Sequence, residues 1–186
     1  MNIPGSPPSF AHLTPSTSLA PGSSEDLARR RLKNEFKRMK ETDHLTNFFS
    51  TSPEKNDIMI WNAVIFGVYG SLYEGGIFEL VMIFCREYPY KPPQIKFLSR
   101  IFHPNVSSDG TVCPEILQRN WSPATKVALI VKSLISLLDN PCLDDETNYN
   151  PKATDLFQTN KSNYKKFVND CVDESLKGDN DPETSL

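Results

Sequence analysis

The sequence predicts an α+β domain in which a four-stranded antiparallel meander is flanked by an N-terminal helix, a central helix and two C-terminal helices. Three observations carry this prediction: a helical pattern opens the charged part of the chain, short apolar runs separated by Gly and Pro groups follow, and further helical patterns close it. Short strands with short turns between them favour an antiparallel meander, and helices that are separate from the strands in sequence are typical of the α+β class. The 186 residues suit one domain with loose ends.

The two ends of the chain differ in composition from its middle. Residues 1–24 carry no charged side chain and are rich in Pro, Ser, Thr and Gly, which predicts a flexible leader. Residues 178–186 are acidic and predict a frayed tail, so 25–177 is predicted to be the folded domain. Ser23 or Ser24 precedes two acids and is predicted to cap a helix that runs to about Glu41.

Apolar runs rich in Ile, Val and Phe predict the strands. They lie at Ile58–Phe66, Ile77–Phe84 and Gln94–Leu98, with a weaker candidate near Leu45–Thr51. The segment 101–123 has no regular period and is predicted to be a long loop, a feature that is often functional in compact domains.

Three helical patterns follow this loop. A strongly apolar pattern between Val127 and Leu138 predicts the central helix. A short helix is predicted at Lys152–Thr159, and apolar side chains between Tyr164 and Val172 predict a final amphipathic one.

Composition excludes several classes of function. The net charge of −3 argues against a surface that binds nucleic acid directly, and no apolar stretch is long enough for a membrane span. The four cysteines form no Cys-x-x-Cys pair, so neither a zinc site nor a disulfide framework is expected. We therefore expect no cofactor, no metal and a reducing compartment.

Two residues of the long loop carry possible chemistry. A single loop cysteine such as Cys113 is by itself more often a small buried residue than a nucleophile, although Gly110 just before it and the irregular loop favour function. His103 is followed by Pro104, which restricts its backbone, and nothing in the sequence brings its imidazole to the thiol. His103 is therefore predicted to be a packed structural residue.

Taken together, four motifs in order resemble the ubiquitin-conjugating enzyme family over about Leu27–Leu176. The motifs are Tyr88-Pro89-Tyr90-Lys91-Pro92-Pro93, His103-Pro104-Asn105, Cys113, and Trp121-Ser122-Pro123-Ala124. Within the family, the segments 28–32, 36–40, 60–67 and 102–106 are most similar to the post-replication DNA-repair branch.

The resemblance implies an acyl-transfer reaction at Cys113. In the family, this cysteine accepts the C-terminal carboxyl group of ubiquitin from the activating enzyme as a thioester and passes it to a substrate lysine. A thiol suits this task because it is nucleophilic and its thioester is readily attacked by an amine. The resemblance gives the Asn105 amide the role of supporting the oxyanion or the loop around it. It gives Asp145, the second acid of Asp144-Asp145, the role of orienting and deprotonating the incoming lysine.

The resemblance also implies protein partners. The basic first helix, with Arg30 and Arg31, meets the activating enzyme and the ligase in the family, and a further set matches the loops presented to RING-type ligases: Tyr90, Ser122, Pro123 and Ala124. The implied location is cytoplasmic, nuclear or both.

Several positions depart from the family pattern. Pro114 stands where Leu is typical, Glu115 replaces Asp or Ser, and Cys142 replaces Asn near the rim of the site; Glu146 and Thr147 stand where the family commonly has Pro and Leu. Two alternatives remain open: an enzyme for another modifier of the SUMO or NEDD8 type, and a weakly active scaffold with the same fold. The absence of an insertion between Cys113 and Trp121 argues against the SUMO enzyme.

Overall fold

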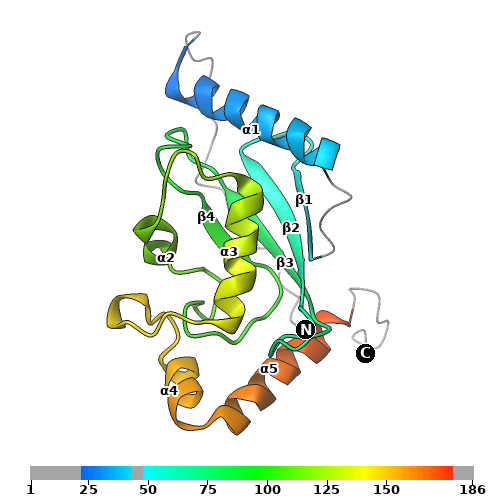
Figure 1. Cartoon of the computed structure of the whole chain (residues 1–186), viewed down its shortest axis with the longest axis vertical. Coiled ribbons are helices and arrows are strands. Elements are labelled where there is room, and N and C mark those ends of the chain that lie inside the picture. The colour runs from blue at the N-terminus through cyan, green and yellow to red at the C-terminus, as the bar shows by residue number, and fades with distance from the viewer. Residues whose placement is uncertain (1–21, 43–47, 178–186) are drawn as a thin grey trace, which may run out of the picture.

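The computed structural model describes residues 22–42 and 48–177, which fold into one sheet with helices around it (Figure 1). Most of the predicted leader and all of the predicted tail lie outside these residues. The elements in chain order are α1 (Ser24–Thr42), β1 (Phe49–Pro53), β2 (Ile60–Phe66), β3 (Ile77–Ile83), β4 (Gln94–Phe97), α2 (Pro114–Arg119), α3 (Val127–Asp139), the single 3-10 turn η2 (Asp145–Thr147), α4 (Pro151–Thr159) and α5 (Lys161–Ser175).

The sheet is the predicted four-stranded antiparallel meander, with strand order β1-β2-β3-β4. Its register places Trp61 opposite Met82 and Ala63 opposite Leu80, and all four side chains are buried. Because side chains alternate between the two faces of a strand, this register directs one apolar row of each strand into the core.

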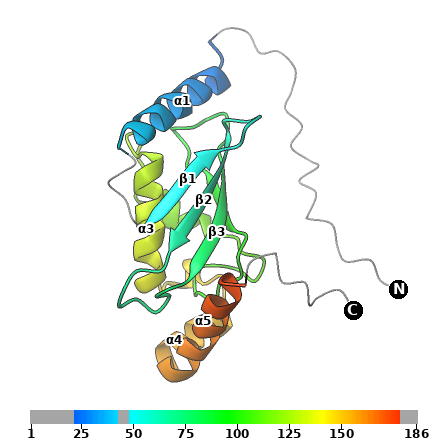
Figure 2. The same ribbon diagram turned by 90° about the vertical axis from the view of Figure 1, so that its right-hand side faces the viewer.

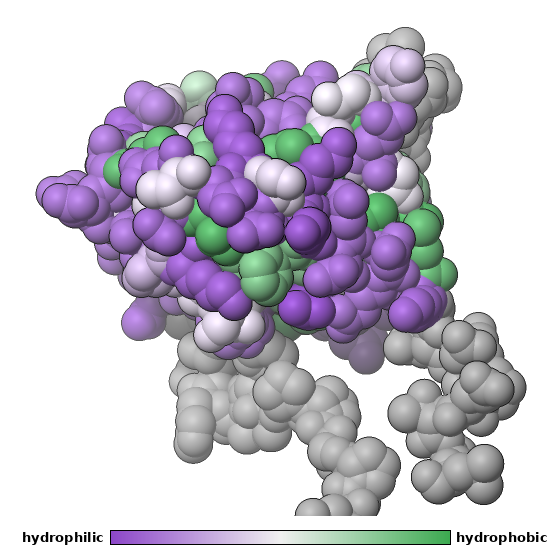
Figure 3. Space-filling model, turned by 90° about the horizontal axis from the view of Figure 1, so that it is seen from below, coloured by the Kyte–Doolittle hydropathy of each residue, from purple (hydrophilic) through white to green (hydrophobic). Residues whose placement is uncertain are grey.

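Helix α3 lies across one face of the sheet, as the two views at right angles show (Figures 1 and 2). Its buried side chains fill the space between helix and strands: Val127, Ile130, Val131, Leu134, Leu137 and Leu138. Helices α4 and α5 form the lower end of the molecule, where hydrophilic side chains cover most of the face and hydrophobic ones form small separate groups (Figure 3).

Helix α1 begins as its sequence predicts. The Ser23 hydroxyl accepts a hydrogen bond from the Asp26 amide (3.2 Å), and the Asp26 carboxylate in return accepts one from the Ser23 amide (3.3 Å). These bonds satisfy amide groups that the first turn leaves without helical partners. Leu32 is fully buried, and the Phe36 ring packs edge-on against Trp61 with centroids 5.7 Å apart.

Most predicted elements are confirmed to within about two residues. The weak strand near Leu45–Thr51 corresponds to β1, although residues 43–47 lie outside the described part of the chain. The prediction of an unbroken loop over 101–123 is wrong, because it contains helix α2. Pro114 is the first residue of α2, a position where the missing N–H costs no helical hydrogen bond, and six residues are too few for a clear apolar period.

A buried carboxylate joins α1 to the start of α3. Glu35 is 6% exposed, and it accepts hydrogen bonds from the Val127 amide (2.7 Å), from the Tyr88 hydroxyl (2.9 Å) and from the Arg31 guanidinium. The negative charge at the first residue of α3 also complements the helix dipole. Glu35 thus fixes two helices and the Tyr88 segment relative to one another.

We predict that Glu35→Gln lowers the free energy of unfolding by roughly 2–4 kcal/mol, because the neutral amide brings N–H groups to a place where three donors need acceptors. Urea unfolding with an unchanged m-value measures this loss. Glu54→Gln is the matched control, since the exposed Glu54 carboxylate accepts a bond from Asn62 (2.7 Å) and its change should stay within about 0.5 kcal/mol. Equal losses in the two variants would contradict the role assigned to Glu35.

Candidate functional site

The loop before Cys113 is fastened to the sheet at strand β4. The Val112 amide donates to the Ile95 carbonyl (3.0 Å), and the Cys113 amide donates to the Asn105 carbonyl (3.0 Å). Gly110 has a φ of 89° and lies so close to strand β4 that an added Cβ would be 2.2 Å from the Phe97 carbonyl oxygen. Only glycine fits there, so the tight turn that returns the chain to Cys113 depends on this residue.

Cys113 immediately precedes α2, and its side chain is fully buried. The thiol donates a hydrogen bond to Glu115 Oε2, with Sγ and the oxygen 3.0 Å apart, and Sγ lies 4.0 Å from the Glu146 carbonyl oxygen. Burial first, and then the hydrogen bond to Glu115, raise the pKa of the Cys113 thiol to about 11. The thiol of the resting site is therefore protonated at neutral pH.

The Asn105 side chain is buried, and both its NH2 group and its oxygen form hydrogen bonds to one neighbouring loop. Its Nδ2 donates to the carbonyls of Cys142 (2.6 Å) and Thr147 (2.9 Å), and its Oδ1 accepts from the Cys142 amide (2.8 Å). Of the two roles expected for Asn105, this geometry supports the loop role. In the resting site both N–H bonds are engaged, so an oxyanion role requires one of them to be released.

Residues 142–147, which Asn105 holds in place, are called the gate here, and their two acids Asp144 and Asp145 have different surroundings. The Asp144 carboxylate forms an ion pair with Arg119 of α2, and the Glu146 carboxylate lies 3.5 Å from the same guanidinium. The hydrogen bond from Arg119 lowers the pKa of Asp144 below its ordinary value. Asp145 begins η2 and is exposed. Arg119 thus holds Asp144 and Glu146 against α2, while the Asp145 carboxylate faces solvent near the Cys113 segment.

Sequence reasoning missed one member of the site. The Tyr149 hydroxyl donates to Glu115 Oε2, with the two oxygens 3.4 Å apart. Tyr149 lies 36 positions after Cys113 in a segment without a motif, so no local pattern could connect the two residues. Glu115 was known only as a departure from the family pattern, and nothing in the sequence indicated that it touches the thiol.

His103 is the structural residue that the sequence predicts. It is fully buried, its Nε2 lies 2.9 Å from the Leu137 carbonyl oxygen, and its Nδ1 accepts from the Asn105 amide (3.0 Å). An accepting Nδ1 and a donating Nε2 define a neutral imidazole. Burial lowers the pKa of His103 to about 4, which keeps it neutral at physiological pH.

The other cysteines occupy different surroundings. Both Cys85 and Cys171 fall within apolar periodic segments of the sequence, which predicts core positions for them. Cys171 is buried in α5 as this pattern predicts, whereas Cys85 follows the end of β3 and is only half-buried. Cys142 is half-buried at the rim, with Sγ 3.4 Å from Arg119 Nη1.

Four of the predicted partner residues gather on two adjacent loops. Tyr90 is 75% exposed, and the Ser122, Pro123 and Ala124 side chains are exposed too. The Trp121 indole N–H donates to the Pro89 carbonyl (2.8 Å), which fastens one loop to the other. Arg30 is exposed on α1, whereas Arg31 is half-buried and donates to the Thr125 carbonyl (3.3 Å) as well as to Glu35.

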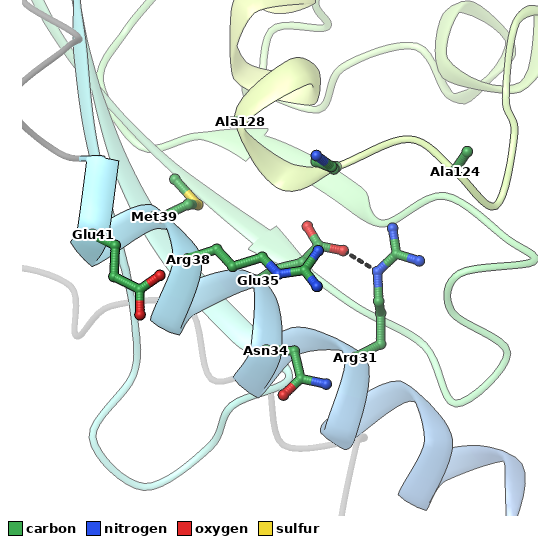
Figure 4. A pocket seen from close by; sticks show the side chains of 9 residues that line it. Arg31, Asn34, Glu35, Arg38, Met39, Glu41, Ala124 and Ala128 are labelled. Atoms are coloured by element: carbon green, nitrogen blue, oxygen red, sulfur yellow. Dashed lines mark hydrogen bonds and ion pairs between the residues drawn. The ribbon is translucent and has the colours of Figure 1, made fainter.

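A cavity of about 710 Å³ lies between α1 and the start of α3 (Figure 4). Its lining includes Arg31, Glu35, Arg38 and Lys126, and Figure 4 shows the Arg31–Glu35 ion pair at its wall. Neither Cys113 nor Glu115 is among its lining residues, so this cavity is separate from the thiol.

Within residues 22–42 and 48–177, no group of three or more His, Cys, Asp or Glu side chains could hold a metal ion. In the same part of the chain, no helix is both long and apolar enough to cross a membrane.

Comparison with known proteins gives a consistent result. A model of the family described as "Ubiquitin-conjugating enzyme" matches residues 31–172. The chain is 45% identical over 152 residues to "Ubiquitin-conjugating enzyme E2 2" of Kluyveromyces lactis, an alignment that covers 82% of this chain and 90% of the relative. The proteins of the same name from Eremothecium gossypii and Saccharomyces cerevisiae are each 44% identical, with 82% of this chain and 87% and 86% of the relatives covered.

His103 generates a prediction about acid stability. Its pKa of about 4 in the fold lies below the ordinary 6.5 of an unfolded chain, so the unfolded state binds a proton first as the pH falls. The stability from neutral His103 is fully present above pH 6.5 and is lost progressively towards pH 4, by roughly 3 kcal/mol. His103→Gln should be less stable than the parent at pH 7 but lose less stability between pH 7 and pH 4.

Urea unfolding at a series of pH values measures this difference. His12→Gln, in the predicted leader, is the control and should keep the parent pH dependence. An unchanged pH dependence in His103→Gln would contradict the assignment of a neutral buried imidazole.

Proposed function

The chain belongs to the ubiquitin-conjugating enzyme family, and from this premise we propose that Cys113 is the residue that carries ubiquitin. Cys113 accepts the C-terminal acyl group of ubiquitin from the activating enzyme as a thioester, and a substrate lysine then attacks that thioester. The observation that carries this proposal is the position of the thiol: it lies at the junction of the long loop and α2, beside the acidic turn η2. Acceptance and transfer of the acyl group both take place at one sulfur, so no metal or cofactor is required.

The surroundings of the other cysteines support this choice. Cys171 is buried in a helix and Cys85 follows a strand on another segment, whereas Cys113 adjoins a loop whose backbone is fixed by hydrogen bonds. A nucleophile needs a fixed position relative to the groups that act with it, and the hydrogen-bonded loop supplies one for the buried Cys113 thiol. Cys142, at the rim, is the alternative acceptor that a test has to separate from Cys113.

We assign the lysine step to Asp145 and Asn105. Lysine has an ordinary pKa near 10.4, so it must lose a proton before it attacks. Among the acids of the gate, Asp145 is exposed while Asp144 and Glu146 contact Arg119, which leaves Asp145 available to an incoming ammonium group. Asn105 holds the gate loop in place and, when one of its N–H bonds is released, offers that donor to the oxyanion.

The partners follow from the family and from the exposed loops. We propose that the surface formed by Tyr90 and residues 122–124 meets a RING-type ligase, because an exposed aromatic side chain beside a fixed loop is a suitable anchor. Arg30 and Arg31 on the basic helix α1 then contribute to binding of the activating enzyme or the ligase. We further propose that the protein acts in the cytoplasm, the nucleus or both, and that it serves post-replication DNA repair, whose family branch its motifs resemble.

The first test concerns the identity of the acceptor. The parent protein, incubated with activating enzyme, ATP and ubiquitin, should form an adduct that a thiol reductant removes. Cys113→Ser should form an adduct that resists the reductant, because an oxygen ester replaces the thioester, and Cys113→Ala should form none. Non-reducing gels measure all three, with Cys142→Ala as the matched control that keeps the labile adduct. A labile adduct in Cys113→Ala would contradict the proposal and indicate Cys142.

The second test separates acceptance from transfer. Asp145→Ala should accept ubiquitin nearly normally but discharge it onto free lysine about 10- to 100-fold more slowly, because the amine loses its proton acceptor. Higher pH should restore much of this rate, since it supplies neutral lysine. Asn105→Ser should also discharge slowly, with little rescue by pH, because it lacks the amide that fixes the gate loop.

Single-turnover discharge of preloaded enzyme between pH 7 and pH 10 measures both variants. Asp173→Ala, which alters an exposed acid of α5, is the control for the loss of one negative charge. Equal rescue of both variants, or rescue of neither, would contradict the division of roles.

A further inference from the structure

One carboxylate oxygen of Glu115 accepts two hydrogen bonds at the site. The Cys113 thiol donates to Oε2 with Sγ 3.0 Å away, and the Tyr149 hydroxyl donates to the same oxygen at 3.4 Å. The bond from Cys113, together with the other donors around the carboxylate, lowers the pKa of Glu115 below its ordinary value. Glu115 is therefore ionised at neutral pH, and the proton between it and Cys113 resides on sulfur.

This arrangement poses a problem for the acceptance of ubiquitin. With a thiol pKa of about 11, fewer than one molecule in a thousand carries the thiolate at neutral pH. The thiolate is the nucleophile, so the thiol has to lose its proton during the reaction. His103 cannot take it, because its imidazole is engaged by Leu137 and Asn105.

Among the charged groups around the sulfur, only one is a candidate acceptor for the thiol proton. On the η2 side, Asp144 and Glu146 contact Arg119, and Asp145 is exposed. On the α2 side, Arg119 also helps to lower the pKa of Glu115. Tyr149, from the segment before α4, has a pKa raised by burial and then by Glu115, so it stays protonated and acts as a donor. Among the described acids, Glu115 is the one whose oxygen contacts Sγ.

We propose that Glu115 is a catalytic residue that takes the Cys113 proton while ubiquitin is accepted, and that Tyr149 is a positioning residue that holds the Glu115 carboxylate against the thiol. The proposal rests on the proposed function of Cys113. It differs from the assignment of Asp145, because it concerns the arrival of ubiquitin rather than its transfer to lysine.

The step is balanced in atoms and charge. As Cys113 Sγ bonds to the thioester carbonyl of the ubiquitin–activating enzyme adduct, its S–H bond breaks and the proton passes to Glu115 Oε2. The tetrahedral intermediate then collapses, and the bond from its carbon to the sulfur of the activating enzyme breaks. The departing thiolate takes the proton from Glu115, which becomes a carboxylate again.

A weak base is sufficient for this transfer. A free thiol gives up its proton reluctantly, but a sulfur that is forming a bond to a carbonyl carbon becomes much more acidic as it loses electron density. Proton transfer to a carboxylate thus becomes favourable during bond formation, when the acceptor is already within hydrogen-bond distance. The existing 3.0 Å contact supplies that distance without any rearrangement.

The test is a pair of measurements that should move in opposite directions. Glu115→Gln keeps the size and one acceptor oxygen of the side chain but removes its basicity and charge. Alkylation of Cys113 by iodoacetamide at pH 8, followed peptide by peptide in a mass spectrometer, should become about 3- to 10-fold faster, because the negative charge that opposes the thiolate is gone. Single-turnover acceptance from preloaded activating enzyme at pH 7 should become about 10- to 100-fold slower, because the proton acceptor is gone.

Three further variants define the controls. Tyr149→Phe should slow the acceptance of ubiquitin by about 2- to 5-fold, in the same direction as Glu115→Gln. Tyr69→Phe, which changes an exposed tyrosine, is its matched control. Glu115→Asp should lie between the parent and Glu115→Gln, because it restores the base at a greater distance. Glu54→Gln controls for the loss of one negative charge. The ratio of Glu115→Gln to parent acceptance should rise towards one as the pH is raised from 7 to 9.5, because hydroxide increasingly removes the thiol proton without help from Glu115.

Two outcomes would overturn this proposal while Cys113 remained the acceptor. If Glu115→Gln accelerated both alkylation and acceptance, Glu115 would merely suppress the thiolate. If its acceptance stayed at the parent rate at pH 7, no proton would pass through it. A labile adduct in Cys113→Ala would instead overturn the proposed function, so the two failures are distinguishable.

Discussion

The buried amide of Asn105 is the contact on which the geometry of the site depends. Two loops that are about 40 residues apart in sequence meet there, because one side chain bonds to the Cys142 amide and carbonyl and to the Thr147 carbonyl. The backbone of the same residue bonds to the Cys113 amide. One asparagine therefore sets the distance between the thiol and the gate, and its own position is fixed from behind by neutral His103. A buried, fully bonded polar network of this kind is rigid, since each broken bond would leave an unsatisfied group.

The parts of the molecule that we propose to bind partners are held by similar means. Glu35 fixes α1 to the start of α3, and the Trp121 indole fixes the loop of residues 122–124 to the Tyr90 loop. In both cases a single buried or half-buried polar side chain joins segments that are distant in sequence. The sheet and α3 supply the core, while these bonds determine how the exposed segments lie relative to Cys113.

The sequence predicted the structural features that depend on a local pattern of residues. The strands, α1 and α3 follow from apolar periodicity, and the structural role of His103 follows from Pro104 and the lack of any feature that links its imidazole to the thiol. Prediction from the sequence failed for features that no local pattern of residues indicates. Helix α2 is too short for a period, and the contact of Tyr149 with Glu115 joins segments 34 positions apart. The raised pKa of Cys113 depends on burial and on the direction of one neighbouring carboxylate, neither of which a residue list contains.

The acidic surroundings of Cys113 are the reason why we assign the two proposed proton transfers to two different carboxylates. Glu115 contacts the sulfur, and Asp144, Asp145 and Glu146 are exposed acids at and just before the neighbouring turn η2, where Arg119 contacts two of them. Such a field stabilises positive charge and opposes negative charge. Burial first, and then Glu115, keep the resting thiol protonated, while the exposed acids attract a lysine side chain and favour its ammonium form. Both nucleophiles consequently enter the site with a proton that must leave before they react. Glu115 contacts the sulfur from α2, whereas Asp145 is exposed on η2, and we therefore propose a separate proton acceptor for each step. Glu115 beside the sulfur and Asp145 at the open side of the gate satisfy these two geometric requirements separately.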